Sequence, residues 1–228
     1  MQENKLLIPF SIIIAGGLIS WGLFATRAPA ESFSAETNNN EQAQAQIQIS
    51  VKESDHILGS PNAKIKMITF TDFECSYCKI FHQTMEQIMS EYAKDERVSW
   101  VVRHFPVHGE STNTKAIATE CAAELGGESK FWEMGEKIFE TDENGWTKVD
   151  QLGTVAQSIG LNQTEFLACL ELEDKAKKIE DDYQSGIGIG IEGTPHTIVI
   201  TESGEIFPIS GAQPYDAVRS LIEMILAE

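Results

Sequence analysis

The sequence is short of positive charge. Its 228 residues hold 17 lysines and arginines against 35 aspartates and glutamates, which gives a formal net charge of −18 at pH 7. Nucleic acids and acidic lipid surfaces are bound through clusters of basic side chains, which so acidic a chain does not readily supply. We therefore expect no nucleic-acid partner. Much of the acid falls between Glu110 and Asp182, where we expect a solvated helical surface.

Cysteine is also scarce, with four residues in the chain. Cys75 and Cys78 stand two residues apart, whereas Cys121 and Cys169 have no ligand-like neighbours. A zinc site would need a second ligand pair, and attachment of a c-type haem would need histidine directly after Cys78, where the chain has Lys79. The pattern favours a redox-active dithiol, with no metal and no cofactor beyond the Cys75–Cys78 disulfide.

Charge is absent from Leu6–Thr26, a run long enough to cross the roughly 30 Å hydrocarbon core of a membrane as a helix. We expect residues 6–26 to be an uncleaved membrane anchor within an N-terminal segment 1–30. The alternative is a cleaved signal peptide, because Ala28-Pro29-Ala30 has the small-x-small form of a cleavage site.

Residues 31–52 contain neither glycine nor proline and are rich in Glu, Asn, Gln, Ala and Ser. This composition predicts a flexible linker. Alternation of Ile47, Ile49 and Val51 at its end favours the start of a first strand. We place the folded domain at residues 53–228.

Within the domain, apolar periodicity predicts a strand, a helix and a second strand, which form a βαβ unit with a parallel strand pair. A helical insertion follows over about residues 112–184, with start signals at Thr147 with Asp150 and at Asn162 with Glu165. A β-hairpin and a last helix complete an α/β fold. The expected elements are strands 64–73, 98–107, 196–201 and 206–210, and helices 78–93 and 214–227.

Cys75 follows the apolar run Met67–Phe70 and precedes the amphipathic stretch Ile80–Tyr92, which places it at a helix start. Unpaired N–H groups and the helix dipole stabilise a thiolate there. We expect a depressed pKa for Cys75, the attacking sulfur, and a resolving role for Cys78.

These residues resemble the DsbA-like form of the thioredoxin fold, in membrane-anchored or secreted bacterial proteins. The resemblance covers roughly residues 53–227. It rests on the CxxC at a strand-to-helix turn, on the helical insertion between the βαβ unit and a C-terminal ββα unit, and on local agreement at Asp55–Gly59, Thr71–Cys75, Arg103–Pro106, Lys130–Met134, Gly193–Pro195 and Gly211–Pro214.

The resemblance implies an extracytoplasmic thiol:disulfide oxidoreductase, with an oxidase of reduced secreted proteins as the favoured form. It also implies reoxidation by a quinone-linked membrane thiol oxidase of the DsbB-like or VKOR-like kind. A reductase or isomerase of the same fold and a non-redox tethered chaperone or binding module remain alternatives. The expected location is the cell membrane with the catalytic domain outside the cytoplasm or, after cleavage near Ala30, the periplasm or medium.

The resemblance further implies a cis Thr194–Pro195 bond beside the CxxC, where the Thr194 backbone pairs with substrate. Some family members carry a second cysteine pair, which makes Cys121 and Cys169 a candidate structural disulfide; two buried thiols are the alternative.

Two positions depart from the family pattern. Many thioredoxin-fold proteins have a buried carboxylate six residues before the first cysteine, which moves the proton of the second; this chain has Thr69 there. We expect Asp72 to face away, which leaves water or Lys79 and Glu74 for that task. Ser76 stands where proline is usual. Candidate modulators of the dithiol are Glu74, Ser76, Tyr77 and Lys79.

The other side chains near these motifs are interpreted as structural. We expect Glu74 to lie mainly on the surface, His82 on a helix surface and His104 at a strand end. Trp100, Trp132 and Phe131 are expected in the core. Gly188–Gly193 spells GxGxxG, but a proline and a strand follow it, so we expect close packing and a turn rather than a nucleotide site.

Overall fold

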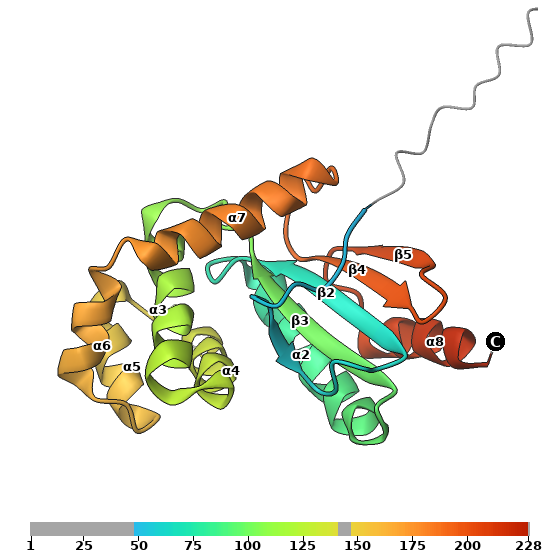
Figure 1. Ribbon diagram of the computed structural model, residues 1–228, viewed down its shortest axis with the longest axis horizontal. Helices are drawn as coiled ribbons and strands as arrows, with labels where there is room; N and C mark the ends of the chain where they lie inside the picture. Colours follow the sequence, from blue (N-terminus) through green and yellow to red (C-terminus); the bar gives the residue numbers. More distant parts are fainter. Residues whose placement is uncertain (1–47, 141–146, 228) are drawn as a thin grey trace, which may run out of the picture. The chain divides into compact units, whose positions relative to one another are not determined.

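A five-stranded sheet forms the centre of the computed structural model, which describes residues 48–140 and 147–227 (Figure 1). Contacts group Ile47–Glu228 into one unit. The expected anchor at 6–26, the Ala28–Ala30 site and most of the linker lie outside the described residues. Among the residues that are described, no helix has the length and apolar content needed to span a membrane.

The strands are β1 (His56–Leu58), β2 (Ile65–Thr71), β3 (Val98–His104), β4 (His196–Thr201) and β5 (Ile206–Ser210). Their order in the sheet is β1-β3-β2-β4-β5. Strands β2 and β3 pair in parallel, as the βαβ prediction requires, and the other neighbours are antiparallel. The expected first strand near Ile49 and Val51 is wrong, because these side chains pack in a loop against the apolar face of the sheet.

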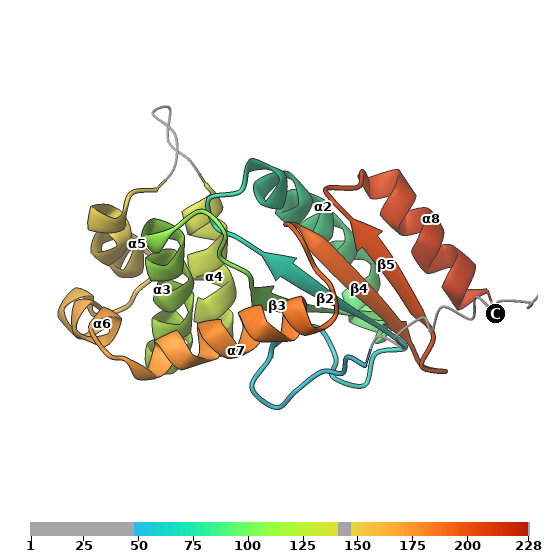
Figure 2. The same cartoon turned by 90° about the horizontal axis from the view of Figure 1, so that it is seen from above.

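Helices cover both faces of the sheet (Figure 2). On one face, α2 (Ser76–Tyr92) and α8 (Tyr215–Leu226) bury an apolar cluster that includes Phe81, Ile88 and Ile222. On the other face, α7 (Asp174–Gly188) runs along β3. Each fully buried apolar side chain contributes about 1.5–3 kcal/mol by leaving water. The sheet therefore holds the start of α2 in a fixed place.

The predicted helical insertion is confirmed and runs from Glu110 to Gly188. Asn162 caps α6 (Gln163–Leu170) through the backbone N–H groups of Thr164 and Glu165, as predicted. The start signal at Thr147 is wrong, because its hydroxyl donates to the Lys137 carbonyl and the next turn begins after Lys148. A disulfide joins Cys121 to Cys169 across two helices. The insertion contains α3 (Glu110–Gly126), α4 (Glu128–Phe139), α5 (Leu152–Ser158), α6 (Gln163–Leu170) and α7.

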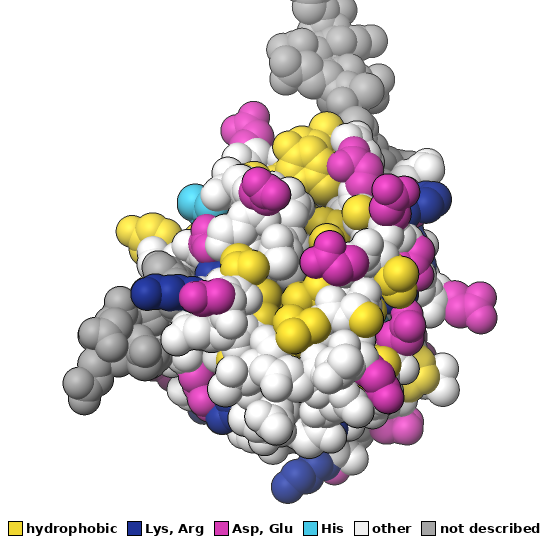
Figure 3. Space-filling view, turned by 90° about the vertical axis from the view of Figure 1, so that its left-hand side faces the viewer, with side chains coloured by type: hydrophobic (Ala, Val, Ile, Leu, Met, Phe, Trp, Pro, Cys, Tyr) yellow, Lys and Arg dark blue, Asp and Glu magenta, His cyan; other side chains and the backbone are white. Residues whose placement is uncertain are grey.

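The acidic residues of the insertion are not all solvated. Figure 3 shows acidic side chains over the end of the molecule that carries these helices, but Glu120 and Asp182 are buried. Glu120 accepts hydrogen bonds from His56 and His104, which ties α3 to β1 and to the end of β3. Although burial opposes its charge, His56 has its pKa raised to about 9 by the carboxylates of Glu120 and Glu128.

Close packing of a glycine occurs at Gly186, two residues before the GxGxxG segment. A Cβ at Gly186 would lie 2.7 Å from a ring carbon of Phe105, whereas one at Gly188, Gly190 or Gly193 would meet nothing within 4 Å. The close-packing prediction for the segment itself is therefore wrong. The turn prediction is confirmed at Gly190, which has φ of +81°.

We predict that Gly186→Ala lowers the free energy of unfolding by about 1–3 kcal/mol, because the added methyl overpacks the contact between α7 and the sheet. Gly188→Ala in the same helix is the matched control, and we expect it to be neutral or to stabilise by up to about 1 kcal/mol. Urea unfolding followed by circular dichroism measures both variants, and equal stabilities would contradict the prediction.

Candidate active site

Cys75 and Cys78 lie at the start of α2, with Cys75 as the N-cap residue. The Cys75 sulfur accepts a hydrogen bond from the backbone N–H of Cys78 at 3.4 Å. Both cysteines are free thiols, and Cys75 is 7% exposed against 1% for Cys78. The two sulfurs therefore differ in access although they are one helical turn apart.

The two thiols also differ in acidity. A hydrogen bond from the Cys78 thiol, aided by Thr194 and the backbone N–H groups of Tyr77 and Cys78, lowers the pKa of Cys75 to about 5 despite burial. Burial, followed by the interaction with Cys75, raises the pKa of Cys78. The reduced site thus holds a thiolate at Cys75 and a thiol at Cys78.

The loop before β4 lies against the more accessible sulfur. The Thr194–Pro195 peptide bond is cis, and the Thr194 carbonyl oxygen is 3.4 Å from the Cys75 sulfur. Residues about 120 positions apart in the sequence therefore form one surface at the start of α2.

Asp72 organises the turn that carries Cys75, a role that the sequence analysis missed. Its backbone carbonyl accepts from the Cys75 N–H, and its own N–H lies 3.5 Å from the Cys78 sulfur. Its carboxylate accepts from the Glu74 N–H at 2.7 Å. An aspartate bonded to the N–H two residues on is an Asx turn, a local signal that was present in the sequence.

The same carboxylate reaches the loop between β3 and α3. It accepts from the Val107 N–H at 2.6 Å, from the His108 ring at 2.9 Å and from the Thr112 hydroxyl at 2.8 Å. Although burial opposes ionisation, these bonds lower the pKa of Asp72. Asp72 raises the pKa of His108 in return. The expectation that Asp72 faces away from Cys78 therefore applies to its carboxylate but not to its backbone.

Glu74 is not mainly a surface residue. Its carboxylate is 2.7 Å from the ammonium of Lys115, which is buried in α3, and it also accepts from the Ser111 hydroxyl. Burial of the Glu74 carboxyl group acts to raise its pKa, but the contacts with Lys115 and Ser111 outweigh burial and lower the pKa. Of the other candidate modulators, Ser76 and Tyr77 are exposed and Lys79 is half-buried. Glu74 thus anchors the turn to the insertion.

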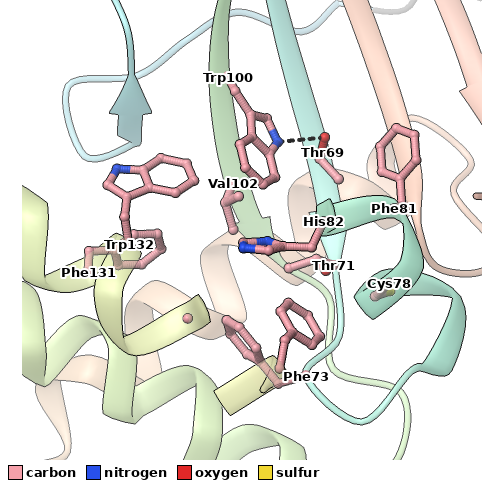
Figure 4. A pocket seen from close by; sticks show the side chains of 12 residues that line it. Thr69, Thr71, Phe73, Cys78, Phe81, His82, Trp100, Val102, Phe131 and Trp132 are labelled. Carbon is pink, nitrogen blue, oxygen red and sulfur yellow. Dashed lines mark hydrogen bonds between the residues drawn. The ribbon is translucent and has the colours of Figure 1, made fainter. Parts of the chain in front are cut away.

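A narrow cavity with a volume of about 10 Å³ lies behind Cys78 (Figure 4). His82 lines it, so the expected position on a helix surface is wrong: its ring packs 5.0 Å from those of Trp100 and Phe139. Burial lowers the pKa of His82 to about 4. The expected core aromatics Trp100, Phe131 and Trp132 line the same cavity. Thr69 accepts from the Trp100 indole at 3.0 Å.

The described residues, 48–140 and 147–227, contain no group of three or more His, Cys, Asp or Glu side chains placed to hold a metal ion. The reactive groups that the start of α2 presents are the free thiols of Cys75 and Cys78.

The sequence is similar to those of several known proteins. The family model described as Thioredoxin matches residues 51–224. Disulfide bond formation protein D of Bacillus subtilis (strain 168) is 27% identical over 172 residues, which are 73% of this chain and 75% of that protein. A Na(+)/H(+) antiporter NhaA of Herminiimonas arsenicoxydans is 30% identical over 63% of this chain, but the chain spans only 22% of its length.

Solved structures agree in fold. Wolbachia pipientis alpha-DsbA1 superposes with a TM-score of 0.68 at 20% identity, covering 78% of this chain and 93% of that chain. Oxidised BdbD of Bacillus subtilis superposes with a TM-score of 0.66 at 24% identity, covering 76% and 94%. The sheet, the helical insertion and the dithiol at a helix start define a thioredoxin-fold protein with a CxxC site. The chain belongs to the thioredoxin family, and its fold is similar to that of the solved DsbA proteins.

We predict that the reaction of Cys75 with iodoacetamide reaches half its maximal rate near pH 5, because the thiolate is the nucleophile and the Cys75 pKa is about 5. Cys78, with a raised pKa and a buried sulfur, should stay unmodified at neutral pH. Peptide mass spectrometry of the reduced chain at a series of pH values measures both. A half-point for Cys75 near 9.0, the ordinary thiol value, would contradict the assignment.

We predict that Asp72→Asn lowers the pKa of His108 towards its ordinary value of 6.5, because the carboxylate that favours the imidazolium is lost. Proton NMR titration of the histidine rings measures this shift. The variant should also lose about 2–3 kcal/mol of stability, since several buried donors lose a charged acceptor. Asp150→Asn, at an exposed residue, is the control and should change neither quantity.

Proposed function

We propose that the protein is an extracytoplasmic thiol:disulfide oxidase that uses Cys75 and Cys78. The main support for this proposal is the difference between the two thiols. Cys75 has a pKa of about 5 and lies beside the Thr194 carbonyl. Cys78 is 1% exposed and has a raised pKa. One sulfur is thus suited to exchange with a substrate and the other to act only within the protein.

In the proposed reaction, a substrate thiolate attacks the Cys75 sulfur of the Cys75–Cys78 disulfide. The bond between the two enzyme sulfurs breaks, a mixed disulfide forms at Cys75, and Cys78 leaves as a thiolate that takes up a proton. The second substrate thiolate then attacks the substrate sulfur and displaces Cys75. The substrate loses two electrons and gains a disulfide, while the enzyme gains the electrons and becomes a dithiol.

The depressed pKa of Cys75 favours the oxidase direction. The thiolate exists only in the reduced protein, and a pKa of about 5 instead of 9.0 stabilises that form by about 3 kcal/mol at neutral pH. For two electrons this raises the reduction potential by about 60 mV. Because the folded pKa is depressed, the stabilisation grows as pH rises above 5 and is lost as pH falls through 5.

We also propose a location, a class of substrate and a reoxidising partner. Residues 53–228 would form the catalytic domain, held outside the cytoplasm by an anchor at 6–26 or released after cleavage near Ala30. Reduced secreted proteins would be the substrates, with their backbone paired to Thr194 beside Pro195. A quinone-linked membrane thiol oxidase would reoxidise the dithiol.

We predict a reduction potential nearer −120 mV than −270 mV, the two ends of the range for related catalysts. The full chain is equilibrated in glutathione buffers, and free Cys75 and Cys78 are counted by peptide mass spectrometry, which separates them from Cys121 and Cys169. A potential near −270 mV would reverse the direction and make the protein a reductase. Cys75→Ala is the control and should abolish thiol–disulfide exchange. Full activity of that variant in a folding assay would show that the protein acts by binding and not by redox chemistry.

A further inference from the structure

A buried thiol must exchange a proton in every turnover, and the usual means is missing from this chain. Cys78 is 1% exposed, and its sulfur alternates between thiol and disulfide in the proposed function, on which this inference rests. The position six residues before Cys75 holds Thr69, whose hydroxyl is engaged with Trp100 and Thr197 and does not titrate near neutral pH. The Asp72 carboxylate is committed to the loop before α3.

The cavity behind Cys78 contains one candidate. Among the described residues that line it, His82 is the only titratable group besides Cys78 itself (Figure 4). The two residues are four positions apart on α2, so their side chains lie on the same face of the helix. The volume of about 10 Å³ is close to the minimum for one water molecule, and Thr71 adds a hydroxyl to the lining.

The same helical face continues to the protein surface. Glu86 is four positions beyond His82, and its carboxylate lies 3.6 Å from the His82 Nε2 atom. The His82 side chain is 11% exposed and that of Glu86 is 41% exposed, so the pair connects the cavity with solvent. The separation of 3.6 Å is slightly longer than a hydrogen bond, and a small movement of either side chain would let Nε2 donate to Glu86. A neutral imidazole that donates from Nε2 has Nδ1 unprotonated and able to accept a proton.

We propose that His82 and Glu86 form the proton route of Cys78, with one water molecule in the cavity between the thiol and the imidazole. When Cys78 attacks a mixed disulfide at Cys75, its proton passes to His82, and the proton on the other ring nitrogen passes to Glu86. The Cys75–Cys78 bond forms, the bond from Cys75 to the partner sulfur breaks, and the partner leaves as a thiolate. The reverse sequence protonates Cys78 in the oxidase direction. In this role, His82 and Glu86 are positioning and relay residues that do not touch the substrate.

The pKa shifts of His82 and Glu86 are consistent with proton transfer from Cys78 through His82 to Glu86. Burial keeps His82 neutral at physiological pH, so the imidazole relays protons and does not store them. Burial and the facing carboxylates of Glu136 and Glu140 raise the pKa of Glu86, which makes it a better acceptor at the outer end. Below that pKa Glu86 is already protonated and no longer accepts a proton.

The test separates the step that uses Cys75 from the step that uses Cys78. The reduced full chain is mixed with oxidised glutathione, quenched with acid at successive times and analysed by mass spectrometry. The first step forms the glutathione mixed disulfide at Cys75, and the second step resolves it through Cys78. In His82→Gln we expect the first step to keep its rate and the second to slow by about 10–100-fold, so that the mixed disulfide accumulates.

Glu86→Gln tests the outer end without disturbing the core. We expect a several-fold slower second step, and the fall in wild-type rate as Glu86 becomes protonated should be absent from the pH profile of this variant. Gln83→Ala, at an exposed residue of the same helix, is the control and should match the wild type.

Second-step rates within twofold of the wild type in both variants would overturn the proton route while leaving the proposed function intact. Should His82→Gln lose its native circular dichroism, the Glu86→Gln rate and pH profile decide by themselves. A wild-type protein that forms no mixed disulfide at Cys75 would overturn the proposed function, and the proton route with it.

Discussion

The carboxylate of Asp72 is the constraint on which the active-site region depends. It lies just after the central strand β2, and it is 1% exposed, so each of its lone pairs needs a donor. The donors come from the turn before Cys75, from Val107 in the loop after β3 and from Thr112 in α3. One buried charge therefore fixes the distance between the end of the sheet, the start of α2 and α3. Glu74 adds a second attachment through Lys115 in α3. The insertion thereby supports the dithiol as well as covering one end of the sheet.

The site stabilises the thiolate of Cys75 and disfavours the thiolate of Cys78. Cys75 lies at a helix start with donors around its sulfur, whereas Cys78 lies one turn inside, against the aromatic cavity. Burial opposes a charge on either sulfur, but only Cys75 receives enough hydrogen bonds to overcome it. As a consequence, the two cysteines differ in acidity and in role, although two cysteine side chains in water would have the same pKa. It also creates the need for a proton route, because the sulfur with the raised pKa is the one without access to solvent.

Local patterns were sufficient for the framework of the fold. The β-branched run before the turn at Gly204 and the short run after it predicted β4 and β5 at their observed bounds, and helical spacing predicted α2 and the insertion. Errors arose where a side chain is covered by a segment distant in sequence. Glu74 and His82 look like surface residues beside Cys75 and on α2, but α3 covers the first, and the aromatic rings of β3 and the α4 region cover the second. The short strand β1 was missed because three residues carry too little periodicity, and its pairing with β3 defines it.

The position of Cys75 and Cys78 at the start of a helix could be inferred from the amino-acid sequence, because their spacing and the periodicity around them are properties of the local chain. The DsbA-like form of the thioredoxin fold was implied by the resemblance of the surrounding motifs. Which polar groups surround the two sulfurs depends on the three-dimensional packing of the chain. Asp72, Thr194 and His82 come from a strand end, a distant loop and the helix itself, and each acts through burial and contact. Burial and contact arise from packing between segments far apart in the chain, so local signals such as the Asx turn at Asp72 and the spacing of His82 from Cys78 do not by themselves give the acidity of each sulfur.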